Sequence, residues 1–256
     1  MEIEVYTLNS GSKSNSTYIH IGDTRILIDA GMSMKATETE LQKIGASLKQ
    51  IDGIFITHEH SDHVKGLQVI TKKHPIPIHV SELSAPHIDC DTRSFIVHKP
   101  VFMHSFGSVE VESFVTPHDS RGSVGYLIKT DNYTFGLATD MGCVTSDVLN
   151  KLAECDSVVL ESNHDRIMLE SGSYPMSLKK RILSNKGHLS NDACAECAAL
   201  IAGNGVKHIM LAHLSDENNR PNIALITTAT EMARKNLSRT VIKVANRNSI
   251  TKLCSQ

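Results

Sequence analysis

Three histidines and an aspartate that could bind a metal lie within six consecutive residues, His58-Glu59-His60-Ser61-Asp62-His63, directly after a largely apolar segment. Imidazole suits zinc and other first-row transition metals, and a carboxylate widens the choice to manganese or iron. In an extended loop, side chains two residues apart can point the same way, so His58 and His60 could share one metal ion. Asp62 and His63, after a further turn, could then face a second ion. The alternative, a solvated polar loop, is much less favoured for so dense a pattern.

Other histidines and cysteines of the chain are interpreted as structural. Seven of the 14 histidines have no potential partner at a useful spacing and are expected to be surface or packed residues: His20, His74, His79, His87, His98, His104 and His208. The six cysteines are scattered in a chain without an export signal, which predicts reduced thiols. Cys194 and Cys197 form a C-x-x-C on one face of an expected helix, with no second cysteine pair, so core packing is the favoured role.

The elements that must position these residues alternate along the chain. Strands are predicted at 2–8, 16–21, 24–29, 51–57, 75–80, 95–98, 101–104, 108–116, 124–130, 133–139, 157–160, 207–213 and 241–244, the last closing the sheet. Helices are predicted at 34–46, 64–73, 144–153, 175–184, 191–202 and from Pro221 onward. The strand over 51–57 leads directly into the histidine-rich segment. Two strand-rich units with helices outside indicate an α/β layered sandwich.

Size and composition restrict the class of protein. The chain has 256 residues, 40% of them hydrophobic and 21% charged, which fits one globular domain over 1–256. No apolar stretch approaches the roughly 18–20 residues that span a bilayer, so no membrane association is expected. The first residues carry acidic side chains where a secretion signal would be basic, which predicts a cytoplasmic location. A formal net charge of −2 provides no global attraction to nucleic acid.

The histidine-rich segment resembles the first metal motif of the metallo-β-lactamase superfamily, T-H-x-H-x-D-H after an apolar strand. Four further segments resemble the other motifs of that family in the same order: Leu27-Ile-Asp-Ala-Gly31, Thr116-Pro-His-Asp119, Leu137-Ala-Thr-Asp-Met-Gly142 and Leu211-Ala-His-Leu-Ser215. The resemblance implies an αβ/βα four-layer sandwich with two metal ions at one edge, between the two sheets. It also implies a metal-dependent hydrolase.

The resemblance assigns a ligand to each matching position. It implies His58, His60 and His118 for the first ion, Asp62, His63 and His213 for the second, and Asp140 as the bridge, with a shared water or hydroxide. Elementary chemistry agrees, because two close cations need an anionic bridge and each must keep an open position for substrate. Asp29 is expected to orient a ligand rather than to bind metal. The ions are zinc, manganese or iron.

Residue types narrow the branch of the superfamily. Lactamases of the family commonly have cysteine where this chain has Asp140, and the diiron branch has glutamate in place of His60. Glu59 is one residue out of register for that role. Two hydrolytic branches remain, the phosphodiesterases and the hydrolases of thioesters or lactones.

Three segments favour phosphodiester chemistry. Leu160-Glu-Ser-Asn-His-Asp165 places ionisable groups after a buried strand, and Gly187-His-Leu-Ser-Asn191 places a histidine and a serine at a helix start, which favours an anion. Lys179-Lys-Arg181, followed by Lys186, is the densest positive charge of the chain. A chain that is neutral to acidic overall can still hold a phosphate backbone at such a place.

These segments resemble the WalJ-type (YycJ-like) subgroup, whose members are related to RNase Z and are known as DNA exonucleases. The matching residues are Ser10-Gly-Ser12, Asn15-Ser16, Glu161 to Asp165, Tyr174-Pro175, Leu178-Lys179, Arg181-Ile182, Gly187 to Asn191, His213-Leu-Ser215 and Glu217-Asn-Asn-Arg-Pro221. The chain departs from the subgroup at Lys13-Ser14, where a glycine is usual. The resemblance implies 5′ to 3′ degradation of duplex DNA.

By similarity to RNase Z, Glu161 and His188 are expected to form a proton relay, and Asn163 and His164 to contact phosphate. Asp62 is also expected to be catalytic. Ser190 at the helix start, and Lys179 and Arg181 in the basic run, are further expected to bind substrate. Alternatively, Glu161 and His188 are structural hydrogen-bonding groups at a loop and a helix cap. Two other functions stay open: a small-molecule hydrolase of thioesters, lactones or cyclic phosphodiesters, and a non-catalytic binding protein that keeps the fold.

Overall fold

The computed structural model describes residues 3–255 and divides into two compact units. Unit 1 comprises the chain up to residue 102, residues 120–124 and the stretch from residue 246 onward. Unit 2 comprises residues 103–119 and 125–245. Each unit is built on one seven-stranded sheet. The single domain expected over 1–256 stays a prediction.

The sheet of unit 1 is antiparallel on one side and parallel on the other. Its strand order is β14 (Thr251–Ser255), β1 (Ile3–Asn9), β2 (Ser16–Ile21), β3 (Thr24–Ile28), β4 (Gly53–Phe55), β5 (Ile78–Ser81) and β6 (Phe95–His98). The strands from β3 to β6 run parallel. The carboxyl ends of parallel strands meet at one edge of a sheet, so the segments after β3 and β4 are neighbours there.

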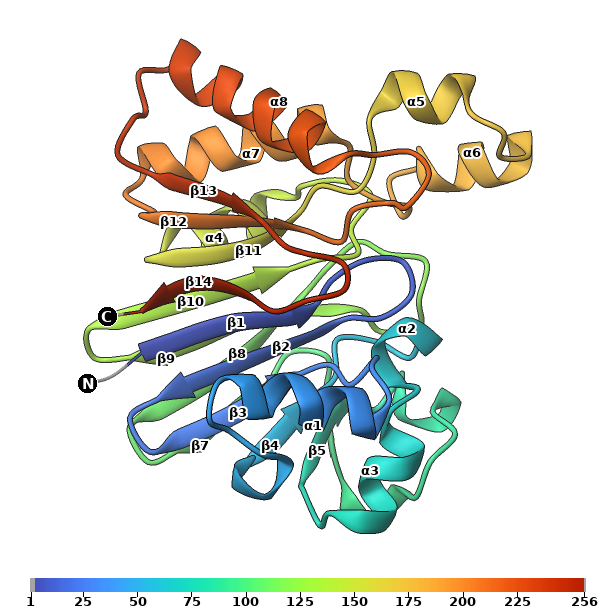
Figure 1. Ribbon diagram of the computed structural model, residues 1–256, viewed down its shortest axis with the longest axis vertical. Helices are drawn as coiled ribbons and strands as arrows, with labels where there is room; N and C mark the ends of the chain where they lie inside the picture. Colours follow the sequence, from blue (N-terminus) through green and yellow to red (C-terminus); the bar gives the residue numbers. More distant parts are fainter. Residues whose placement is uncertain (1–2, 256) are drawn as a thin grey trace. The chain divides into compact units, whose positions relative to one another are not determined.

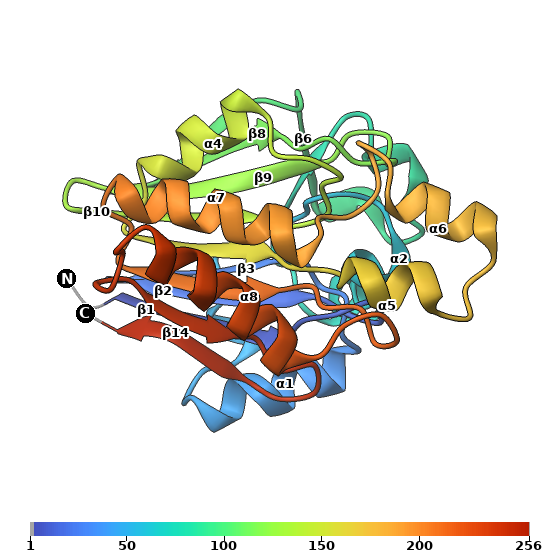
Figure 2. The same cartoon turned by 90° about the horizontal axis from the view of Figure 1, so that it is seen from above.

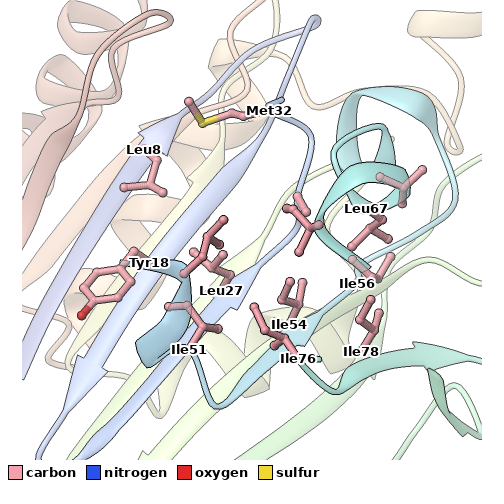
Figure 3. Close-up of a cluster of buried hydrophobic side chains, with 14 of the residues drawn as sticks. Leu8, Tyr18, Leu27, Met32, Ile51, Ile54, Ile56, Leu67, Ile76 and Ile78 are labelled. Carbon is pink, nitrogen blue, oxygen red and sulfur yellow. The ribbon is translucent and has the colours of Figure 1, made fainter. Parts of the chain in front are cut away.

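Helices of unit 1 cover the apolar side of this sheet. They are α1 (Met34–Lys43), α2 (Ser61–Val64) and α3 (Leu67–Lys73), with 3₁₀ turns at Leu48–Gln50, Ala85–His87 and Thr92–Ser94. Figure 3 shows part of the core, where Leu27, Ile54 and Ile78 on three neighbouring strands pack in one buried cluster with Leu67 of α3. Burying each such side chain stabilises the fold by about 1.5–3 kcal/mol.

The helix predicted over 64–73 is interrupted at Gly66, which corrects that prediction. The backbone of another segment approaches Gly66 too closely for any side chain to fit there. A Cβ atom at Gly66 would lie 2.1 Å from the backbone oxygen of Met32 and 2.6 Å from that of Ala30. The Gly66 amide donates to Ala30 O at 2.8 Å, and the Ala30 amide donates to His63 O at 2.8 Å. The break therefore lets the histidine-rich loop pack directly against the segment that follows β3.

The sheet of unit 2 places three strand ends side by side. Its order is β13 (Val241–Val244), β12 (His208–Ala212), β11 (Ser157–Glu161), β10 (Tyr133–Ala138), β9 (Val124–Thr130), β8 (Val109–Val115) and β7 (Met103–Phe106). Strands β10 to β13 are parallel. Polar residues that follow or end β10, β11 and β12 therefore come together at one edge.

Helices α4 (Ser146–Ala153), α7 (Asn191–Gly203) and α8 (Pro221–Arg234) lie side by side on this sheet (Figure 2). Cys194 and Cys197 of α7 are buried in the core that this packing makes, and burial raises the pKa of the Cys197 thiol to about 12. Core packing is thus confirmed for the C-x-x-C. All six cysteines of the chain lie within the described residues, and none of them forms a disulfide.

A pair of short helices, α5 (Arg166–Ser171) and α6 (Met176–Ile182), extends past the strand ends of unit 2 (Figure 1, yellow). Helix α5 was not predicted from the sequence; it spans only six residues and begins where the Asp165 side chain accepts a hydrogen bond from the Met168 amide. Strand β14 was not predicted either, so the strand over 241–244 is not the last of the chain. The strand expected at 101–104 is β7, and the start of the first predicted strand, Glu2, lies outside the described residues.

Two adjacent strands of unit 1 bring together histidines that were expected to lack partners. His79 Nδ1 on β5 lies 3.0 Å from His98 Nε2 on β6, and the two rings stack. His79 is thus a packed residue, as expected, while its contact with His98 was not foreseen, because a pair between parallel strands leaves no mark in sequence spacing. Along residues 3–255, no helix has the length and apolar character needed to cross a membrane.

Candidate metal centre

The histidine-rich loop of unit 1 is organised by the carboxylate of Asp29. Asp29 follows β3 and accepts hydrogen bonds from the Thr57 amide at 2.8 Å and from the Thr57 hydroxyl at 2.9 Å. Its Oδ2 lies 2.7 Å from His63 Nδ1. A carboxylate in this position holds the ring proton on Nδ1, which makes Nε2 the nitrogen that can bind a metal. The contact is the one expected of Asp29 as a residue that orients a ligand.

Three imidazoles of this loop pack tightly together. The ring centroids of His58 and His60 are 4.5 Å apart, and those of His58 and His63 are 4.2 Å apart. His58 and His63 are fully buried, and His58 Nδ1 lies 3.0 Å from the Thr57 hydroxyl. Several buried imidazoles in contact make an unfavourable core unless their nitrogens share a cation. The donor set therefore fits first-row divalent metals.

Asn15 belongs to this cluster, although no role was assigned to it from the sequence. Its Nδ2 lies 3.1 Å from Asp62 Oδ2 and 3.1 Å from His63 Nε2, and its Oδ1 accepts the Gly11 amide. The loop over 10–15 thus contacts two expected ligands. The match of Asn15-Ser16 to the WalJ-type subgroup was the available signal.

Gly31 allows the Asn15 loop and the Asp62 loop to approach each other. A Cβ atom there would lie 1.7 Å from Asp62 O and 2.7 Å from Asn15 N, both backbone atoms. Gly31→Ala is therefore expected to lower stability by about 3 kcal/mol or more and to reduce bound metal. Thermal unfolding and metal analysis of the purified variant check this. Gly45→Ala, at a positive φ of 73° with open space around it, is the matched control, because it strains the backbone without touching the loop.

Glu59 is directed to other parts of unit 1. Its two carboxylate oxygens accept hydrogen bonds at 2.8 Å from the Ser84 hydroxyl and from the Arg121 amide. Glu59 therefore anchors the loop over 120–124, in agreement with its being out of register for metal binding.

The three parallel strand ends of unit 2 carry Asp140, Glu161 and His213. Asp140 and His213 adopt φ angles of 57°, and Asp29 in unit 1 has a φ of 62°. A left-handed backbone conformation costs a non-glycine residue about 1–3 kcal/mol. It therefore persists only where the surrounding structure fixes the residue in that conformation. Three expected site residues thus share a strained backbone at strand ends.

Asp140 lies between two histidines of unit 2. Its Oδ1 is 3.4 Å from His213 Nε2 and 3.9 Å from His118 Nε2. His118 Nδ1 donates to the Gly187 carbonyl at 3.1 Å, so Nε2 is the nitrogen that faces Asp140. Burial lowers the pKa of His118, which keeps the ring neutral as a metal ligand requires.

Glu161 contacts two histidines with one carboxylate oxygen. Its Oε1 is 2.7 Å from His188 Nδ1 and 3.3 Å from His213 Nδ1, while Oε2 accepts the Met141 amide at 2.8 Å. Burial opposes ionisation of Glu161, yet these neighbouring histidines hold the pKa of its carboxyl well below its usual range. The group is a carboxylate that fixes the orientation of both rings. Ligand atoms of Asp140, Glu161, His188 and His213 all lie within 4.8 Å of one another.

The other residues expected to bind substrate have different surroundings. Asn163 donates from Nδ2 to His213 O at 2.8 Å and so supports the strained backbone of that histidine. Ser190 caps α7 by accepting the Ala193 amide at 3.2 Å, as expected of a serine at a helix start. His164 pairs with Ser190 through an isolated parallel bridge.

The two basic residues singled out on α6 are engaged within unit 2. Lys179 donates from Nζ to the carbonyls of Glu170 and Gly172, at 2.8 and 2.7 Å, and so ties α6 to α5. Arg181 pairs with both carboxylate oxygens of Asp119, next to His118. Their role in substrate binding stays a prediction.

Comparison with known proteins identifies the class to which this fold and these donors belong. The family model described as the beta-lactamase superfamily domain matches residues 24–214. The chain therefore belongs to the metallo-β-lactamase family and is a metal-dependent hydrolase. YhfI of Bacillus subtilis, a metallo-β-lactamase fold protein, has a TM-score of 0.74 at 13% identity and covers 98% of this chain and 100% of its own. The predicted fold class is thus confirmed.

Particular relatives are more similar in sequence. The chain is 35% identical to the exodeoxyribonuclease YycJ of Bacillus anthracis over 240 residues, covering 92% of this chain and 91% of the relative. It is also 35% identical to the exodeoxyribonuclease WalJ of Streptococcus pneumoniae serotype 2 over 237 residues, covering 90% and 88%. The resemblance to the WalJ-type subgroup is therefore confirmed.

Proposed function

We propose that the chain is a dinuclear metal-dependent phosphodiesterase, an exonuclease that degrades duplex DNA from the 5′ end. The observation that carries the proposal is the 35% identity to two exodeoxyribonucleases, over 92% and 90% of the chain. Two features of unit 2 support it: a histidine paired with a buried carboxylate, and a carboxylate that lies between two further histidines.

The ligands follow from the family's motif order. We assign one ion to His58, His60 and His118, the other to Asp62, His63 and His213, and the bridge to Asp140. The fixed tautomers of His63 and His118 support the assignment, since each has its Nδ1 engaged by an acceptor. Two divalent ions held in this way would polarise the phosphoryl oxygens and lower the pKa of a water molecule.

His188 is the proposed proton donor. Water attacks phosphorus in line with the leaving oxygen, the P–O3′ bond breaks, and the leaving alkoxide needs a proton. His188 Nδ1 is held by Glu161, so the proton is donated from Nε2. The carboxylate of Glu161 holds the ring in one orientation, and such acid catalysis contributes about 10²–10⁴-fold.

Nucleic acid is the substrate that the charge distribution of unit 2 favours. Lys180, Arg181 and Lys186 are exposed or partly exposed on or just after α6, although the chain as a whole has a formal charge of −2. Local phosphate contacts of this kind weaken as the salt concentration rises, because binding releases counterions from DNA and this release is less favourable at high salt. Activity on DNA is therefore expected to fall steeply with salt, and hydrolysis of a small ester is not.

The test compares the wild type with the His188→Gln variant on several substrates. Each protein, loaded with manganese or zinc, is incubated with end-labelled duplex DNA, single-stranded DNA and RNA, beside thioesters, lactones and cyclic phosphodiesters. Progressive shortening of duplex DNA from the 5′ end is expected. His188→Gln should slow it at least about 10²-fold without loss of bound metal.

His87→Ala is the matched control, because it removes an exposed imidazole of unit 1 that has no part in the proposed site. It should retain full activity. If nucleic acid stays intact while a small ester is hydrolysed rapidly, the proposed nuclease function is rejected and the chain is a small-molecule hydrolase. A metal-loaded protein inert on the whole panel would favour a binding protein.

A further inference from the structure

A small polar cavity lies beside the proposed proton donor, entirely within unit 2. Its volume is about 170 Å³, and it is lined by Gly142, His164, Arg166, Leu183, His188, Ser190 and Ala193. No lining side chain is a phenyl, phenol or indole ring on which a base could stack. The polar lining, without a ring surface for stacking, fits a compact polar group.

His164 indicates that the cavity takes a ligand. Its side chain is 1% exposed, and among residues 3–255 neither ring nitrogen has a hydrogen-bond partner. A buried polar group without a partner costs about 1–3 kcal/mol, so such a group needs an explanation. The backbone holds the residue in place, because His164 O accepts the Asn191 amide at 2.8 Å. Burial lowers the pKa of His164 to about 4, which leaves a neutral ring with one N–H donor.

The surroundings favour an anion. Ser190 and Ala193 belong to the cap and first turn of α7, a helix of 13 residues, and both line the cavity. The N-terminal end of a helix carries partial positive charge and attracts phosphate. Arg166 adds a full positive charge at the rim. The nearby acidic residue Asp192 lines a different groove, between α7 and α8.

We infer that this cavity is the subsite for the 5′-terminal phosphate of the DNA strand, a phosphomonoester. The inference rests on the proposed function, in which 5′ to 3′ cleavage releases the terminal nucleotide. His188 protonates the leaving O3′ of that nucleotide and also lines the cavity, so the cavity is on the leaving-group side. The group that the departing nucleotide carries there is its own 5′-phosphate. Its three acceptor oxygens match the His164 N–H and the helix end.

The experiment measures kcat/KM on duplexes that differ only in a 5′-phosphate or a 5′-hydroxyl end. The wild type is expected to prefer the phosphate by about 10-fold or more, as for a hydrogen-bonded charged group. In His164→Ala the ratio of kcat/KM for the 5′-phosphate duplex to kcat/KM for the 5′-hydroxyl duplex should fall to within about twofold of unity. His164→Asn keeps an amide donor, so its ratio should lie between those of the wild type and the alanine variant. If the alanine variant unfolds, the asparagine variant carries the test. His87→Ala should keep the wild-type ratio.

A binding measurement separates this subsite from catalysis. Calorimetry with the metal-loaded protein should detect a deoxynucleoside 5′-monophosphate, with about 10-fold weaker binding to His164→Ala. A wild type that digests both duplexes equally would overturn the subsite and leave the nuclease standing. Equal slowing of both substrates by His164→Ala would assign the cavity to an internal phosphate and would also overturn it. If neither duplex is digested, the proposed function fails instead.

Discussion

Asp140→Asn is expected to lower kcat/KM on duplex DNA by about 10³-fold or more and to reduce the bound metal. Asp140 is 2% exposed, with Oδ1 3.4 Å from His213 Nε2 and 3.9 Å from His118 Nε2. The amide keeps the size of the side chain and removes its charge. Two divalent ions without an anionic bridge repel each other, and their stabilisation of the transition state is worth several kcal/mol.

Asparagine is chosen because it isolates the charge. The residue at position 140 has a φ of 57°, and asparagine tolerates this left-handed conformation far better than alanine. Folding of the variant should therefore be nearly unchanged without metal, as measured by thermal unfolding of the chelated proteins. Asp23→Asn, in the exposed turn before β3, is the control and should match the wild type. An Asp140→Asn variant with full metal content and over a tenth of wild-type activity would remove Asp140 from the ligand set.

Much of the candidate site could be predicted because its residues lie where strands end. The histidine-rich loop is contiguous. Asp140 comes two residues after Ala138, which ends β10, and His213 directly follows Ala212, which ends β12. A run of apolar residues that stops at an ionisable group is visible locally. In the structure Asp140, Glu161 and His213 lie at the ends of three adjacent parallel strands. Strand ends can be found in the sequence, and the parallel topology then brings them together.

Contacts between distant segments could not be predicted in this way. Asn15 reaches Asp62 and His63 only because Gly31 permits close approach of two loops. The pairing of β14 with β1 joins opposite ends of the chain, which no local pattern reveals. The two carbonyls to which the Lys179 ammonium donates, those of Glu170 and Gly172, were likewise not visible in the sequence. Charge and spacing indicate a residue's chemistry, but its partners depend on tertiary packing.

Glu161→Gln is expected to slow DNA cleavage by about 10²–10³-fold and to weaken metal binding by about 10–100-fold. The carboxylate accepts hydrogen bonds on both oxygens, from the Met141 amide on Oε2 and from His188 on Oε1, which also lies near His213 Nδ1. Glutamine offers a single acceptor oxygen. In either orientation its amide N–H group faces one of the two donors, the Met141 amide or His188, so one of the two hydrogen bonds is lost.

Two readouts distinguish this positioning role from simple destabilisation. At saturating metal, Glu161→Gln should still show a reduced kcat on duplex DNA, because the carboxylate no longer holds the ring of His188. The folded-state pKa of Glu161 lies below the unfolded value near 4.3, so its carboxylate contributes to stability above that pH. That contribution is lost as pH falls through the lower folded pKa, so the stability difference from the wild type should shrink at acid pH. Glu154→Gln, an exposed carboxylate on the same unit, should leave both measurements unchanged. A normal kcat at saturating metal would show that Glu161 does not act through His188, and the proton donor would then have to be sought elsewhere.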